Sequence, residues 1–341
     1  MAAKKRKFSK KTTKVVKTPL PPTHRYLLFA GLLTLALMFL FLPGQHAYFK
    51  EILSDVPEKK QLVFEEIEVA PLPVNTTGVQ PTWLAAQGVY IEDVNSAVVL
   101  YQRNSEMRLA PASLTKMMTA LVVLDHFKPD DRATVNTIIT EGRLMGLQKG
   151  EKITVENLLY GILIHSGNDA AYTLAENYPG GVAAFVAAMN KKAQDLELIN
   201  TSFANPMGFD DPLQYSTPRD LAKLAKVVLE NPTLLKMVGI PNITVSDESY
   251  SIFHPLTNVN ELVGRVPGVA GVKTGFTENA GESLVTLATR NGNRVIIVLL
   301  HSPNRFAETE NTIKWIFENH VWKELKVGQD LDDPTHSAEI E

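Results

Sequence analysis

The chain has 341 residues, 45% hydrophobic and 21% charged, which indicates a globular protein with a large core rather than a disordered chain. The absence of cysteine excludes disulfides, thiol catalysis and cysteine-based metal sites. Nine basic residues and no acidic residue lie within residues 1–25, whereas residues 26–341 carry 25 basic and 37 acidic residues, a net charge of −12. The main body is therefore acidic, and we expect no nucleic-acid partner.

The basic tail over residues 1–25 is followed by an uncharged run of 17 residues, Tyr26–Leu42. This run has the length of a short transmembrane helix. Its basic N-terminal flank and the acidic body beyond it predict a cytoplasmic tail and an exported body. The competing interpretation is a cleaved signal peptide, but Gln45 interrupts the small-residue cleavage pattern that should follow. We therefore predict a single-pass membrane anchor.

Beyond the anchor, residues 43–82 are predicted to be a spacer, residues 83–325 a globular domain and residues 326–341 an acidic tail. Within the domain, two apolar runs at 88–94 and 97–103 predict a β-hairpin. Helices are predicted from the apolar spacing at 113–126, 156–164, 169–177, 181–198, 217–230 and 307–321. Strands separated by turn residues are predicted at 268–276, 283–289 and 294–301.

This order of elements predicts an α+β fold. Strands at both ends of the domain can share one antiparallel sheet, with the helices between them inserted as an all-helical lobe. A cleft is expected where the sheet and the lobe meet.

Three short motifs carry candidate chemistry. The first is Ser113-x-x-Lys116, whose two side chains lie on one side of a helix. A serine nucleophile needs a base, and lysine can be that base only if burial or a second cation lowers its pKa. The second motif, Ser166-Gly167-Asn168, lies between two predicted helices, and the third, Lys273-Thr274-Gly275, ends a predicted strand.

Each motif alone also has an ordinary structural interpretation. Ser113 can begin a helix, Ser166 or Asn168 can cap one, and Lys273 can be an exposed strand end. Only the occurrence of all three in this order favours a catalytic site.

Together the motifs match the S-x-x-K, S-x-N and K-T-G set of penicillin-binding proteins and serine β-lactamases. The segment from Trp83 to Trp322 resembles a serine D-Ala-D-Ala carboxypeptidase, a low-molecular-weight penicillin-binding protein. The wider matching stretches are PASLTKMMTA, SGNDAAYTLAE, NTSFANPMGFDD, YSTPRDLA, GVKTGFTENAG and PNRFAET. The resemblance implies a β-lactamase/transpeptidase-like fold, removal of the terminal D-alanine from peptidoglycan stem peptides, a role in cell-wall biogenesis and covalent inhibition by β-lactams. It implies no metal and no cofactor.

The resemblance also implies roles for the motif residues. Ser113 would form the acyl-enzyme, and Lys116 would take its proton, kept near neutrality by the charge of Lys273. Ser166 would relay a proton to the leaving amine, and Asn168 would bind Lys116 and the substrate amide.

Further residues are expected to bind substrate. Thr274 would contact the substrate carboxylate, and Gly275 would leave the strand edge free for an added substrate strand. The backbone N–H groups of Ser113 and Phe276 would form the oxyanion hole. Arg305 resembles the family's carboxylate-binding arginine, although a surface salt bridge with Glu308 or Glu310 explains it equally well.

The sequence leaves alternatives open. An endopeptidase or a transpeptidase would use the same residues. A β-lactamase would need an additional carboxylate for deacylation, and Glu197-x-x-Asn200 has the wrong spacing. A catalytically inactive cell-wall-binding protein is the alternative from another class. Glu282-Ser283 is more polar than the family pattern predicts, which leaves the rim of the cleft in question.

Overall fold

The computed structural model describes residues 22–41 and 70–324, and the chain divides into two units, residues 1–67 and 68–341. In the first unit, helix α1 (Pro22–Leu40) contains a stretch, Thr23–Leu40, with a mean hydropathy of 1.5 and no buried residue. This helix is long and apolar enough to cross a membrane. Most of the predicted basic tail and spacer, Leu42 and the acidic tail lie outside the described residues.

The second unit is built on a five-stranded antiparallel sheet in the order β3-β2-β10-β9-β8. Its strands are β2 (Gly88–Asp93), β3 (Val99–Arg103), β8 (Val269–Thr277), β9 (Gly281–Arg290) and β10 (Asn293–Ser302). The predicted hairpin and meander are therefore both present, and the two ends of the domain meet where β2 pairs with β10. Strand β8 lies at one edge of the sheet, and within residues 70–324 no strand pairs with its outer side.

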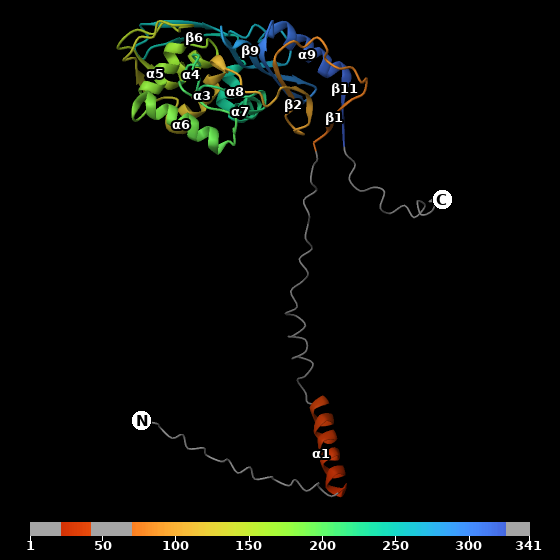
Figure 1. The fold of residues 1–341 in the computed structure, drawn as a ribbon. Helices are drawn as coiled ribbons and strands as arrows, with labels where there is room; N and C mark the ends of the chain where they lie inside the picture. The colour runs from red at the N-terminus through yellow and green to blue at the C-terminus, as the bar shows by residue number, and fades with distance from the viewer. Residues whose placement is uncertain (1–21, 42–69, 325–341) are drawn as a thin grey trace, which may run out of the picture. The chain divides into compact units, whose positions relative to one another are not determined.

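The helices between β3 and β8 form the inserted lobe. Figure 1 shows α3, α4, α5 and α6 at one end of the unit, with α7 and α8 nearer to β2 and β9. They are α3 (Lys116–His126), α4 (Val155–Leu163), α5 (Asn168–Glu176), α6 (Gly181–Asp195), α7 (Pro218–Glu230) and α8 (Pro232–Val238). The lobe also contains two short ribbons, formed by β4 (Arg132–Thr134) with β5 (Lys152–Thr154) and by β6 (Asn242–Ser246) with β7 (Phe253–Thr257).

Two hydrophobic cores hold the sheet between its covering layers. One core joins the lobe to the sheet through residues such as Met117, Leu224 and Ile296. The other lies under helix α9 (Arg305–Asn319), where Trp315 and Ile316 pack with strand residues. In β2, β9 and β10, residues of one core alternate with residues of the other, as the two-residue period of a strand requires.

The start of the domain and the end of its closing helix differ from the prediction. Strand β1 (Leu72–Asn75) pairs with β11 (His320–Lys323), so residues assigned to the spacer are part of the folded domain. Val321 belongs to β11 and not to the closing helix, which ends at Asn319. Figure 1 shows these two terminal strands side by side.

Candidate active site

Ser113 lies on a single 3₁₀ turn, η1 (Ala112–Thr115), which runs directly into α3. This turn is pressed against Gly208. A Cβ on Gly208 would lie 2.1 Å from the carbonyl oxygen of Ala112 and 2.8 Å from the amide nitrogen of Ser113. The φ of Gly208 is also +93°, in the region that favours glycine. The position of the Ser113 hydroxyl therefore depends on glycine at position 208.

Gly275 of β8 lies on the other side of the same turn. A Cβ there would lie 3.0 Å from the oxygen of Pro111 and 3.2 Å from the Cβ of Ala112. The missing side chain would therefore point at η1, with contacts tighter than most Cβ atoms make. Glycine thus also helps β8 to approach the serine turn, beside the unobstructed edge for substrate that the sequence predicts.

The amine of Lys116 is completely buried. Its Nζ lies 3.0 Å from Ser113 Oγ and 2.7 Å from Asn168 Oδ1, and it also hydrogen-bonds the carbonyl oxygen of Met207. The carbonyl and the amide oxygen can only accept. A neutral amine has two hydrogens for them and one lone pair, which can then accept the Ser113 proton.

Burial lowers the pKa of Lys116 from its usual 10.5 to about 7, and the carboxylate of Asp169 partly opposes this shift. A base with a pKa near neutrality is well matched to proton transfer at physiological pH. The sequence analysis offers burial and the charge of Lys273 as causes of this shift. Burial is its largest cause. The two lysines are also coupled, because the charge of Lys116 lowers the pKa of Lys273.

Lys273 is the second buried lysine of the site. Its Nζ donates to Ser166 Oγ over 2.9 Å and to the carbonyl oxygen of Thr274 over 3.1 Å. Burial, followed by the charge of Lys116, lowers its pKa well below the usual value. Ser166 itself has a φ of +63°, an uncommon conformation for serine that holds its hydroxyl between α4 and α5.

A cleft of about 470 Å³ lies between the lobe and the edge of β8. The sequence-predicted residues on its wall are Ser113, Ser166, Asn168, Thr274, Gly275, Phe276 and Arg305. The two lysines lie behind this wall. Residues not singled out as site residues are Gly142, Arg143, Met207, Gly208, Phe209, Val259, Thr277 and Glu282. The matching stretch NTSFANPMGFDD contained three of these, whereas no sequence signal marked Arg143.

Arg305, at the start of α9, points towards β8. Its guanidinium donates to the carbonyl oxygen of Gly275 over 2.7 Å. The alternative salt bridges are not formed, because Glu308 binds Ser302 and Glu310 pairs with other cations. Arg305 is therefore directed into the cleft.

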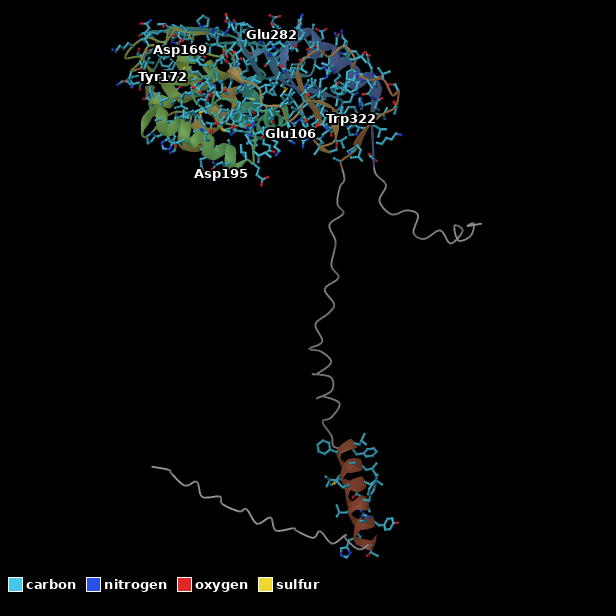
Figure 2. All side chains as sticks on the ribbon, viewed as in Figure 1. Glu106, Asp169, Tyr172, Asp195, Glu282 and Trp322 are labelled. Atoms are coloured by element: carbon cyan, nitrogen blue, oxygen red, sulfur yellow. The ribbon has the colours of Figure 1, made fainter. Side chains whose placement is uncertain are left out.

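Glu282, which is more polar than the family pattern predicts, lies on the wall of the cleft. It stands opposite Phe276 in the β8–β9 register, and its Oε2 accepts the backbone N–H of Arg305 over 3.0 Å. Figure 2 shows Glu282 in the sheet part of the unit and Asp169 among the helices of the lobe. The side chain of Phe276 is 62% exposed, so this residue contributes its backbone rather than its ring to the buried part of the site.

The carboxylate considered for a β-lactamase lies elsewhere. Glu197 follows α6 and lines a separate surface pocket with Lys223. It is not in the cleft beside Ser113.

The geometry agrees with the comparisons with known proteins. A sequence model described as D-alanyl-D-alanine carboxypeptidase, peptidase family S11, matches residues 75–304. The chain belongs to this family. The predicted family and fold class are therefore confirmed.

Three similar proteins illustrate the relationship. D-alanyl-D-alanine carboxypeptidase DacF of Bacillus subtilis is 38% identical over 221 residues, which span 63% of this chain and 57% of that protein. D-alanyl-D-alanine endopeptidase of Pseudomonas aeruginosa is 34% identical over 246 residues, 70% and 79% of the two chains. The crystal structure of penicillin-binding protein D2 from Listeria monocytogenes in the ampicillin-bound form has a TM-score of 0.62 and 30% identity, covering 69% and 98%.

Replacing Gly208 by alanine should displace the serine turn, because the added Cβ would collide with Ala112 and Ser113. We expect acylation by a fluorescent penicillin to slow by at least about 100-fold. Gly146→Ala is the matched control: its φ is +87°, but a Cβ would meet nothing within 4 Å. That variant should lose about 1–2 kcal/mol of stability through backbone strain and keep its acylation rate. Equal rates for the two variants would contradict the assignment of Gly208.

Proposed function

We propose that the protein is a serine-type D-Ala-D-Ala carboxypeptidase that removes the terminal D-alanine from peptidoglycan stem pentapeptides. One observation carries this proposal: a fully buried lysine, with its pKa near 7, lies 3.0 Å from the hydroxyl of Ser113 at the wall of a cleft. A nucleophile beside a base that is neutral at physiological pH is what acyl transfer requires.

In the acylation step, Ser113 Oγ attacks the carbonyl carbon between the two D-alanines, and its proton passes to Lys116. The C–N bond then breaks, and the leaving amine takes up the proton that Lys116 received, relayed through Ser166, which is also hydrogen-bonded to Lys273. Lys116 is then neutral again, free D-alanine departs and the peptide remains as an ester on Ser113. In the second step, water attacks the ester carbonyl carbon and gives a proton to Lys116. The ester C–O bond breaks, and Lys116 returns that proton to Ser113 Oγ, which restores the serine.

The other site residues hold the substrate. The backbone N–H groups of Ser113 and Phe276 stabilise the oxyanion, and Asn168 orients Lys116 and the substrate amide. Thr274 and Arg305 receive the terminal carboxylate, with the charge of Lys273 behind them. A substrate chain can lie along the free outer side of β8 as an added strand.

Endopeptidase activity is a second candidate, because a relative of 34% identity is a D-alanyl-D-alanine endopeptidase. The same residues would then cleave a cross-link in which the leaving amine belongs to a second stem peptide. β-Lactams are expected to acylate Ser113 as substrate mimics, which the ampicillin-bound relative supports. The assembled nucleophile and base argue against a purely wall-binding protein.

The Ser113→Ala variant tests the nucleophile, since only the hydroxyl oxygen is removed. We expect the wild-type protein to release D-alanine from a pentapeptide and to be labelled by fluorescent penicillin, and the variant to do neither. The same preparations are then given a cross-linked dimer. Cleavage of the dimer without release of D-alanine would favour the endopeptidase, and labelling of the variant would refute the assignment of Ser113.

The pH dependence of acylation follows from the pKa of Lys116. Below about 7 the amine is protonated and cannot accept the serine proton, so the rate should rise with pH through that value and then level off. The expected slope is about tenfold for each pH unit on the acid side. Stopped-flow acylation by penicillin between pH 5 and pH 9 measures it, and a flat profile would contradict the role of Lys116.

We also propose that α1 anchors the protein as a single-pass helix, with its N-terminus in the cytoplasm and its catalytic domain outside. The uncharged run that begins at Tyr26 within α1 and the basic residues before that run support this. The protein should sediment with membranes, resist extraction by high salt and dissolve in detergent. A soluble mature protein that begins after Leu42 would contradict the anchor.

A further inference from the structure

Arg143 lies on the lobe side of the cleft, on the loop of residues 141–147 that precedes α4. Its side chain is exposed and lines the cleft together with Ser113 and Arg305. Within residues 22–41 and 70–324, it makes no side-chain hydrogen bond or salt bridge. Its backbone is held by a hydrogen bond, but its guanidinium group has no partner among these residues. The guanidinium group is therefore available to bind a ligand in the cleft.

The backbone of this loop is fixed directly to the second motif. The N–H of Asn168 donates to the carbonyl oxygen of Arg143 over 2.8 Å, and Asn168 Nδ2 donates to that of Glu141 over 3.0 Å. Gly142 allows this approach, because a Cβ there would lie 2.3 Å from Asn168 Nδ2. The position of Arg143 relative to the site is thus set by the same residue that binds Lys116.

The far end of the loop is equally well held. The carboxylate of Asp169 accepts the N–H groups of three consecutive residues over 2.8–3.1 Å, namely Met145, Gly146 and Leu147. The buried ring of His254 contacts the carbonyl oxygen of Met145 over 3.2 Å and pairs with Glu151. None of these contacts uses the Arg143 side chain, so it can be replaced without removing any of them.

Three cations, Arg143, Arg305 and Lys273, lie at or behind the wall of the cleft and favour the binding of an anion. Burial is the main cause of the lowered pKa of both Lys273 and Arg305, and the charge of Arg143 adds a smaller lowering effect to each. The carboxylates of Glu282 and Glu261 raise the pKa of Arg305 and offset part of this effect. Glu282 lies on the opposite side and one of its oxygens is held by the Arg305 backbone. A carboxylate entering between the two arginines would relieve the repulsion between these cations and gain charge-assisted hydrogen bonds.

We propose that Arg143 is a substrate-binding residue that pairs with a carboxylate of the stem peptide from the lobe side of the cleft, across from Arg305. This inference rests on the proposed function. The carboxylate has two possible sources: the terminal carboxylate, shared with Arg305, or a free side-chain carboxylate of an earlier residue of the peptide. Arg143 lines the same cleft as Ser113 and Arg305, so its position is compatible with both sources.

The test compares full-length wild type, Arg143→Gln and Arg143→Lys in detergent on two pentapeptides ending in D-Ala-D-Ala. The peptides differ only in whether the third residue carries a free carboxylate or its amide. We expect Arg143→Gln to raise KM by about 10-fold with little change in kcat, and Arg143→Lys to recover part of the loss. Arg132→Gln, which removes an exposed cation paired with Glu248 outside the cleft, is the control.

The pattern of KM values decides between the outcomes. A rise with both peptides assigns Arg143 to the terminal carboxylate, and a rise only with the free side-chain carboxylate assigns it to that group. An unchanged KM, or a lower kcat alone, overturns the proposal. If wild type releases no D-alanine, the proposed function fails, and Arg143 is judged instead by the penicillin concentration needed for half-maximal acylation, because penicillin also carries a carboxylate.

Discussion

The burial of the Lys116 amine is the constraint on which the rest of the site depends. Removing an ammonium group from water is expensive, and a protein avoids that cost by lowering the pKa and losing the proton. The partners of this amine come from three separate parts of the chain, around Ser113, Asn168 and Met207. These three segments of the lobe must therefore pack together before the lysine becomes a base, and catalytic competence depends on that packing.

Close backbone contact is the means by which this burial is achieved. Gly208 and Gly275 bring two other segments against the serine turn, and Gly142 does the same for Asn168. Gly208 leaves room for backbone atoms of the serine turn, Gly142 for the side chain of Asn168, and Gly275 for both kinds of atom. The motif residues supply the chemistry, and these glycines set the distances between them.

Much of the fold and of the site could be predicted from the sequence, because the decisive signals were local. Turn residues marked the meander, apolar spacing marked the helices, and three motifs marked the nucleophile, the relay and the second lysine. The pairing of β1 with β11 carried no such signal, since it joins four-residue segments about 250 positions apart. The role of Arg143, the cause of the Lys116 shift and the reason for Gly275 each depend on tertiary contacts, which a single motif does not encode.

The pairing of β1 with β11 brings the two ends of the domain together, which affects how the domain can be attached to a membrane or to another protein. Val74 lies opposite Val321, so the chain enters and leaves the fold at neighbouring points. A tether joined to either terminus would emerge from the same face and would hold the cleft in the same direction. For this domain, N-terminal and C-terminal attachment are geometrically interchangeable, and a short loop joining the two ends would permit a circular permutation that leaves the catalytic residues in place.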